Sequence, residues 1–383
     1  MIFFKTRINF IRRRVVAAGL LFLFILPPVL PAGRGADITE GSNPPPRFAV
    51  ERWTAAEAVF HSDPRWLGGD GAASVDLGNR RILWLFGDSF VDPSGNGNRR
   101  SSTLVRNAVG VQTGYDPVSA SMVFAWKTMA GKPTAFFPES GDAWYWPASG
   151  IMLGKRLLVF LMTVRSADNN LGFEPCGWKA VWIDNPQVQP DSWNMIRLVS
   201  PQQQGLVVGV GTPVLKNGFL YAFAAGGKDH SVYLVRWPAT AASAGTLTMP
   251  QWWAGEAAGW ITGPSGTARF RPVFTDGQME FSVTVGGEPE LYRRIQTKSL
   301  LNPCLSVSTA PFLTGPWTAA TCFFTPPETG PSDLLIYAGK AHPALRGADL
   351  VLSYVVNTTD PERLLTDMSI YFPVLLKGKI ISD

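Results

Sequence analysis

Two aspartates that a β-hairpin would bring together are the residues of this sequence best suited to chemistry. The segment GGDGAASVDLGNRRILWLFGDSF, residues 68–90, contains Asp70 and Asp88 on either side of the turn candidate Gly78-Asn79. A tight two-residue turn at that dipeptide places Asp70 opposite Gly87, with Asp88 one pair nearer the open end of the hairpin. In a regular pleat the two side chains would lie on opposite faces, but the many glycines make regular pairing doubtful there.

Paired carboxyl groups suit the cleavage of a glycosidic bond. One carboxyl group protonates the leaving oxygen, and the other activates a water molecule or attacks the sugar directly. Crowding two acids raises the pKa of one of them, which keeps a proton available near neutral pH. Spacing alone leaves two alternatives open. Both aspartates could cap turns, as aspartate commonly does beside glycine, or they could bind calcium, although no clustered acidic loop supports a calcium site.

An aromatic residue and a further carboxylate are candidates for contacting a sugar. Trp146 belongs to the segment WYWP at 144–147, which we expect to precede a strand of the second repeat, and its ring could line a cleft. Core packing is the alternative for any one tryptophan. Glu280 interrupts the apolar run Met279–Val283, so it points either to solvent or into a central funnel as a third carboxylate.

Polar residues at two further places could donate hydrogen bonds to a sugar. Lys340 and His342 lie in the segment YAGKAHP at 337–343, at the end of a predicted strand, where they could bind hydroxyl groups or tune an acid. A structural histidine is the alternative. Arg106 and Asn107 could likewise contact substrate, with hydrogen bonding between neighbouring repeats as the alternative. We therefore take these four residues, together with Trp146 and Glu280, as predicted substrate-binding residues.

Short apolar runs separated by glycine, proline, asparagine and aspartate predict an all-β fold. Helical periodicity is almost absent. The clearest runs are Arg81–Phe86, Arg156–Leu161, Gly218–Phe223, Met279–Val283 and Asp349–Val355. They recur roughly every 60–75 residues, a spacing that suits four-stranded blades with generous loops. We predict a five-bladed β-propeller, and a two-sheet sandwich with long loops is the alternative.

The N-terminus has the order of a secretory signal peptide. Five basic residues lie within the first fourteen positions, the uncharged apolar stretch Val15–Leu30 follows, and small residues lead up to Ala36. This order predicts a cleaved signal peptide and a secreted or periplasmic protein, with an uncleaved membrane anchor as the alternative. The predicted organisation is a signal peptide over 1–36, a flexible leader over 37–47 and one propeller domain over 48–383.

Charge and composition limit the classes of partner that the protein can bind. The net charge of +5 comes largely from the basic N-terminus, so the remaining domain is close to neutral and lacks the footprint of a nucleic-acid-binding protein. Charged residues make up 16% of the chain, and 14 tryptophans offer aromatic surfaces for sugars. We expect a polysaccharide or oligosaccharide as the partner and a monomeric protein without stable membrane insertion after cleavage.

The cysteines and histidines predict no metal site. Cys304 and Cys322 flank two adjacent predicted strands, where an oxidising compartment would permit a disulfide, and Cys176 is left over. None of the three histidines has ligand spacing with a cysteine, so we predict neither zinc nor another cofactor.

Several of these segments resemble one known family. They are Gly68–Phe90, Trp146–Gly150, Tyr337–Leu345 and Leu350–Thr358. These segments are similar to domain of unknown function 4185, grouped as glycoside hydrolase family 183. The similarity runs in the same order over most of the chain. The resemblance implies a five-bladed propeller, endo-acting hydrolysis of D-arabinan, and a catalytic pair that maps onto Asp70 and Asp88. Another furanose-containing polysaccharide is an alternative substrate, and a non-catalytic glycan-binding or structural propeller of the cell envelope is the alternative function.

Overall fold

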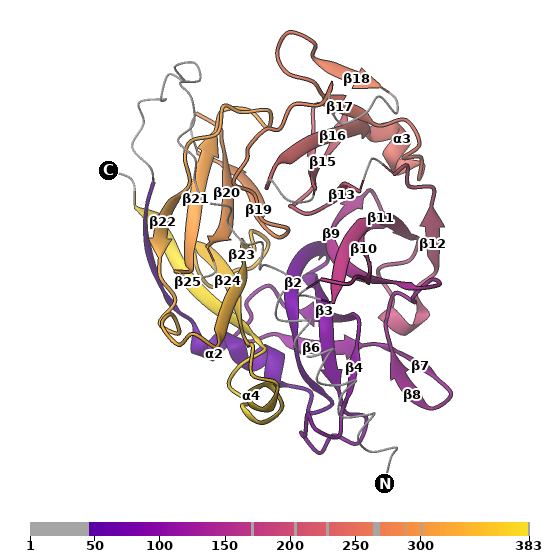
Figure 1. The fold of residues 1–383 in the computed structure, drawn as a ribbon, viewed down its shortest axis with the longest axis vertical. Coiled ribbons are helices and arrows are strands. Elements are labelled where there is room, and N and C mark those ends of the chain that lie inside the picture. The colour runs from indigo at the N-terminus through magenta and orange to yellow at the C-terminus, as the bar shows by residue number, and fades with distance from the viewer. Residues whose placement is uncertain are drawn as a thin grey trace.

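Five antiparallel sheets surround a common centre, as Figure 1 shows. This computed structural model describes residues 46–169, 172–202, 205–226, 230–262, 269–287, 289–299 and 302–381. The predicted signal peptide and nearly all of the predicted leader lie outside these residues. The arrangement confirms the predicted five-bladed β-propeller. In each blade one strand lies nearest the centre, and the following strands lie progressively farther out.

The first two blades follow one another along the chain. Blade 1 contains β2 (Trp66–Gly78), β3 (Arg81–Val91), β4 (Thr103–Val105), β5 (Ala108–Thr113) and β6 (Ser121–Ala125). A separate two-stranded ribbon follows, made of β7 (Lys127–Met129) and β8 (Lys132–Thr134). Blade 2 contains β9 (Ala143–Leu153), β10 (Arg156–Ser166), β11 (Phe173–Ile183) and β12 (Met195–Leu198).

The remaining three blades complete the ring. Blade 3 contains β13 (Val207–Val208), β14 (Val214–Lys216), β15 (Phe219–Ala225), β16 (Val232–Pro238), β17 (Gln251–Trp253) and β18 (Trp260–Thr262). Blade 4 contains β19 (Ser282–Gly286), β20 (Leu291–Lys298), β21 (Cys304–Ala310) and β22 (Thr321–Phe324). Blade 5 contains β23 (Leu334–Ala341), β24 (Leu350–Thr358), β25 (Pro373–Ile381) and β1 (Arg47–Arg52).

One of the predicted strand positions is wrong. Four of the apolar runs overlap β3, β10, β15 and β24, each of which is second from the centre in its sheet. The run Met279–Val283 instead overlaps β19, the first strand of blade 4, and its first three residues precede that strand. First and second strands of a blade are both short and apolar, so periodicity along the sequence cannot tell them apart.

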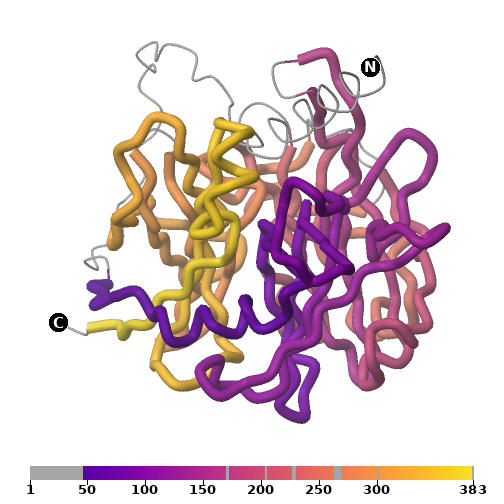
Figure 2. Tube along the Cα trace, turned by 90° about the horizontal axis from the view of Figure 1, so that it is seen from below, coloured from indigo at the N-terminus to yellow at the C-terminus, as the bar shows by residue number. Residues whose placement is uncertain are grey.

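Strand β1 closes the ring by pairing with the last strand of the chain. β1 runs antiparallel to β25, with Phe48 opposite Ile380 and Arg52 opposite Leu376. Figures 1 and 2 both show the indigo start of the described chain beside its yellow end. The buried guanidinium of Arg99 supports the same junction, because it donates to the carbonyl oxygens of Leu67 in blade 1 and Ile370 before β25. Closure in this way leaves few unpaired strand edges.

The cores lie between neighbouring blades, and many tryptophans are part of them. Trp66 stacks on Phe124 with ring centroids 4.3 Å apart, and Trp252 stacks on Phe270 at 4.6 Å. Trp178 and Trp237 meet between blades 2 and 3. These side chains are buried, so most of their surface stabilises the ring and is not available to a ligand.

The helices of the described chain are short and peripheral. They are α2 (Thr54–Glu57), the 3₁₀ turns η1 (Ala58–His61) and η2 (Pro190–Ser192), α3 (Ala239–Ser243) and α4 (Pro361–Thr366). None of the helices in the described ranges has the length and apolarity needed to cross a bilayer. A disulfide joins Cys304 in β21 to Cys322 in β22, a pairing that the sequence left open, and Cys176 is a free thiol.

Candidate functional site

The hairpin that contains both aspartates turns one residue later than predicted. Gly78 pairs with Arg81, so the two-residue loop is Asn79-Arg80. Both loop residues have positive φ, 52° for Asn79 and 61° for Arg80. A hairpin turn with left-handed geometry at both central positions matches the right-handed twist of the strands. Asparagine tolerates that conformation, which explains why the loop contains it.

A β-bulge brings Asp70 and Asp88 together. Gly69 pairs with Ser89 and Gly71 pairs with Phe86, so Asp70 alone faces the two residues Gly87 and Asp88. The ladder is irregular here, as the glycines indicated, because an extra residue in β3 interrupts it. Asp70 lies directly on Gly87, since a Cβ built there would be 2.4 Å from Asp70 Oδ1. Only glycine leaves room for the carboxyl group in this position.

Asp88 is a buried carboxylate that accepts hydrogen bonds on both oxygens. Its exposed fraction is 1%. Trp146 Nε1 donates to Oδ1 at 2.8 Å, and Arg106 Nη1 approaches Oδ2 at 3.3 Å. The hydroxyl of Tyr371 donates to the backbone oxygen of Asp88 at 3.0 Å. A guanidinium and an indole N–H aimed at one carboxylate stabilise its ionised form.

The surroundings of Asp70 favour the protonated form of its carboxyl group. Burial raises the pKa of its carboxyl group well above the ordinary value, and the negative charges of Asp88 and Glu280 raise this pKa further. The hydrogen bond from Tyr337 and the charge of Lys340 act in the other direction on the same pKa, with smaller effect. The residue as a whole nevertheless keeps some exposed surface. Asp70 therefore combines a raised pKa with partial exposure.

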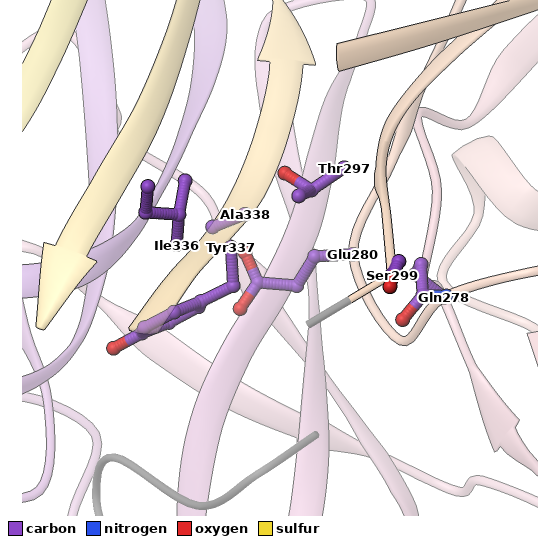
Figure 3. A pocket seen from close by; sticks show the side chains of 7 residues that line it. All are labelled: Gln278, Glu280, Thr297, Ser299, Ile336, Tyr337 and Ala338. Atoms are coloured by element: carbon purple, nitrogen blue, oxygen red, sulfur yellow. The ribbon is translucent and has the colours of Figure 1, made fainter. Parts of the chain in front are cut away.

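Glu280 and Lys340 form an ion pair beside this hairpin. Lys340 Nζ lies 2.5 Å from Glu280 Oε2 and also donates to the backbone oxygen of Gly71 at 2.5 Å. Lys340 is buried, whereas the Glu280 side chain is 15% exposed. Lys340 thus ties the residue after Asp70 to blade 4. In Figure 3 the Glu280 carboxylate lies close to Tyr337, while Gln278 and Ser299 lie on the far side of the same pocket.

The site lies where the first strands of four blades begin. Asp70 is in the first half of β2, Trp146 in the first half of β9 and Tyr337 in the first half of β23, while Glu280 precedes β19. Next to it, a cavity of about 20 Å³ at the centre of the ring is lined by residues of all five blades, including Ser74 and Lys340. That volume accommodates about one water molecule. The carboxyl groups therefore lie beside a small cavity at the centre of the ring.

Comparison with known proteins identifies the family. A family model described as "Domain of unknown function (DUF5005)" matches residues 56–373. The chain belongs to the DUF5005 family. The match runs from α2 to the start of β25 and so includes both aspartates. The resemblance to domain of unknown function 4185 stays a prediction, because the model that matches is a different one.

One solved structure shares the fold of this DUF5005 chain, and two others align with it at lower TM-scores. A protein of Bacteroides ovatus ATCC 8483, provisionally named a hydrolase, aligns with a TM-score of 0.70 at 17% identity, over 86% of this chain and 90% of that one. An exo-β-1,3-galactanase of Phanerochaete chrysosporium aligns with a TM-score of 0.46 at 14% identity, over 82% and 60% of the two chains. An α-L-arabinofuranosidase of Coprinopsis cinerea gives 0.44 at 10%, over 82% and 92%. No curated protein matches the chain significantly.

Two of the predicted substrate-binding residues of the DUF5005 chain are structural. The Asn107 side chain is buried; its Nδ2 donates to the carbonyl oxygens of Phe137 and Tyr145, and its Oδ1 accepts from the Phe137 N–H. His342 is 1% exposed, and its ring nitrogens lie 2.7 Å from the hydroxyls of Ser74 and Ser353. In both side chains every polar atom already has a partner inside the protein, so the structure gives these two residues a structural role.

Three other predicted ligands support the carboxyl groups. Trp146, which lies within β9 and not before it, holds Asp88 through its indole nitrogen. Lys340 holds Gly71 and Glu280. Arg106 reaches Asp88 and lies over the ring of Trp144 at 4.1 Å, and its side chain is 13% exposed. Of the three, Arg106 is the most accessible to a ligand.

Sequence reasoning missed Tyr337, Asn357 and Tyr371. Tyr337 donates a hydrogen bond to Asp70 Oδ2 at 2.9 Å, and Asn357 Nδ2 donates to the Tyr337 hydroxyl at 3.0 Å. Tyr337 is the first residue of the segment 337–343, which also contains Lys340. Its position in that segment was the signal that could have identified it. Within the described ranges, no group of three or more His, Cys, Asp or Glu side chains is arranged to hold a metal ion. The arrangement supports proton transfer between oxygen atoms.

Proposed function

We propose that this DUF5005 protein is a secreted glycoside hydrolase. The observation that carries the proposal is the contrast between Asp70 and Asp88. Burial and the charges of Asp88 and Glu280 raise the pKa of Asp70, whereas Trp146 and Arg106 donate hydrogen bonds to the Asp88 carboxylate. Hydrolysis of a glycosidic bond needs an acid and a second carboxylate in different protonation states. The environments of the two aspartates differ in the required sense.

In the proposed reaction Asp70 is the general acid. Its proton passes to the glycosidic oxygen as the bond from that oxygen to the anomeric carbon breaks, and the leaving sugar departs with a new hydroxyl group. Asp88 takes the second role, either accepting a proton from the attacking water or attacking the anomeric carbon itself. Substrate must displace Arg106 from Asp88 for this step. The hydrogen bond from Arg106 to Asp88 is long, at 3.3 Å, and the Arg106 side chain is 13% exposed, against 1% for Asp88.

A furanose-containing polysaccharide is the proposed substrate, with endo-acting cleavage of D-arabinan as its most specific form. The resemblance of Gly68–Phe90 and Tyr337–Leu345 to the 4185 family supports this choice. Arg106 supplies guanidinium donors at the site, and such donors suit the hydroxyl groups of a sugar next to the scissile bond. The central cavity beside the site holds about one water molecule and has no room for a sugar, so the sugar chain must reach the site without passing through this cavity.

A reducing-end assay tests the proposal. The purified protein is incubated with D-arabinan, other arabinans, fructans and bacterial envelope glycans. We expect release of reducing ends from a furanose polymer, and losses of about 10²–10⁴-fold in Asp70→Asn and Asp88→Asn. Asp76→Asn is the matched control, because Asp76 is an exposed aspartate of the same hairpin. It should keep wild-type activity and show that the hairpin tolerates the change of charge.

Three outcomes of this assay separate the alternatives. Full activity in both Asp70→Asn and Asp88→Asn would contradict the assignment of the pair. Saturable polysaccharide binding without reducing ends over long incubation would make the protein a glycan-binding propeller. Glu280→Gln decides the second role: a loss as large as that of Asp70→Asn, combined with activity in Asp88→Asn, would transfer that role to Glu280. Circular dichroism of each variant confirms that the fold is intact.

A further inference from the structure

The hydrogen bonds around Tyr337 have a defined direction. The Asn357 side chain is fully buried in β24, and its Oδ1 accepts from the backbone N–H of Thr358 at 2.7 Å. This contact makes the other end of the amide, Nδ2, the donor to the Tyr337 hydroxyl at 3.0 Å. The Tyr337 hydroxyl has one proton, and it donates that proton to Asp70 Oδ2 at 2.9 Å.

We propose that Tyr337 is a positioning residue that, held by Asn357, occupies Asp70 Oδ2 and directs the acidic proton of Asp70 to Oδ1. A neutral carboxyl group has one proton and two oxygens, and the oxygen that accepts a hydrogen bond from Tyr337 is the poorer place for the proton. Oδ1 is the atom that lies against Gly87. The proposal rests on the proposed function, since directing the proton matters only if Asp70 gives it to a substrate.

The surroundings of Tyr337 keep the hydroxyl in place. Its ring is 2% exposed and packs with Leu335 and Val355. The ladder between β23 and β24 is irregular just after Tyr337, where Ala338 adopts a positive φ of 58°. A non-glycine residue in this conformation is strained, and the surrounding contacts must offset that strain. The irregular backbone lets the Tyr337 ring point toward Asp70 while Lys340, three residues later, reaches Gly71.

Tyr337 also acts on the acidity of Asp70. Its hydrogen bond stabilises the ionised carboxylate and so lowers the pKa of Asp70, against the larger effect of burial. Removing the hydroxyl should therefore raise this pKa. A general acid is active while protonated, so the alkaline limb of its pH–rate profile lies at its pKa. Loss of the Tyr337 hydroxyl moves that limb to higher pH, while the maximal rate falls because the proton is no longer confined to Oδ1.

Tyr337→Phe tests the proposal, with Tyr354→Phe as the matched control. Tyr354 is also a buried tyrosine of blade 5, and its hydroxyl donates to Glu328 at 2.8 Å, away from the aspartates. For Tyr337→Phe we expect kcat to fall at least about tenfold with KM within about twofold, and the alkaline limb to move upward. Tyr354→Phe should change neither. A wild-type kcat in Tyr337→Phe, with an alkaline limb of the pH–rate profile that does not move, would overturn the proposal.

A measurement without substrate separates this proposal from the proposed function. The carboxyl band of Asp70 is obtained as the infrared difference between the wild type and Asp70→Asn, and followed over pH in the Tyr337→Phe and Asn357→Leu backgrounds. We expect the titration of Asp70 to move upward in Tyr337→Phe, and to move in the same direction by less in Asn357→Leu. An unchanged titration in Tyr337→Phe overturns the proposal. A shifted titration in a protein that cleaves no glycan supports the contact and contradicts only the proposed function.

Discussion

Replacing Gly87 by alanine displaces the proposed acid without removing it. A Cβ at this position would lie 2.4 Å from Asp70 Oδ1 and 3.6 Å from Trp146 Cδ1, against an ordinary contact distance of 3.4 Å or more. The Asp70 carboxyl group must therefore move by about 1 Å. The backbone of Gly87 is not left-handed, so alanine causes no conformational strain of its own. The clash falls on the carboxyl group alone.

The size of the effect follows from this displacement. A misplacement of about 1 Å at a reacting group costs on the order of 10²-fold in rate, equivalent to about 2.7 kcal/mol of activation free energy. We expect kcat on the glycan substrate to fall by about that factor. The free energy of unfolding should change by only about 1 kcal/mol, since one hydrogen bond from Tyr337 is weakened.

The assay compares Gly87→Ala with Gly286→Ala. Gly286 ends β19 in a non-left-handed conformation, and an added Cβ meets only the end of the flexible Arg293 side chain, at 3.2 Å. Gly286→Ala should keep wild-type kcat. Wild-type kcat in Gly87→Ala, with unfolding in urea confirming a stable protein, would refute the view that Asp70 works from its present position.

Three further predictions concern stability. His342 has a pKa lowered to about 3 from an ordinary value of 6.5 by burial, so its contribution is complete above pH 6.5 and is lost as pH falls toward 3. The unfolding free energy measured in urea should drop by about 2 kcal/mol more between pH 7 and pH 5 in the wild type than in His342→Gln, and equal drops would contradict this. Removing the disulfide by Cys304→Ser with Cys322→Ser, a sequence separation of 18 residues, should lower the unfolding free energy by about 3 kcal/mol without changing kcat. Asn107→Ala should cost about 2 kcal/mol, because it leaves buried backbone groups without partners, and an unchanged urea midpoint would show that water replaces the amide.

The fold was predictable because its signal is repeated along the chain. Five apolar runs at similar spacing indicated five blades, and the structure confirms that number. The closure of the ring by β1 was not predictable, since it joins Phe48 to Ile380 across nearly the whole chain. The local composition of β1 does not show that it is the outermost strand of blade 5. The same residues could equally form the first strand of a new blade.

From spacing alone, only the contact between the two aspartates of one hairpin was predictable. Local turn chemistry indicated that Asp70 and Asp88 meet, and the glycines around them indicated an irregular ladder. Which strand carries the extra residue depends on tertiary contacts, including the one from Lys340 to Gly71. The Tyr337 contact to Asp70 joins residues 267 positions apart, which no spacing rule reveals. Likewise, the burial of Asn107 and His342 depends on neighbouring strands that the sequence alone does not place.

The dependence of rate on the leaving group tests the central claim most directly. The measurement is the ratio of kcat/KM between the wild type and Asp70→Asn, on the polysaccharide and on an aryl furanoside whose phenol leaves without protonation. If Asp70 is the general acid, the ratio is about 10²–10⁴ on the polysaccharide and far smaller on the aryl furanoside. Equal ratios on the two substrates would contradict the account, because the proton of Asp70 would then have no part in bond cleavage.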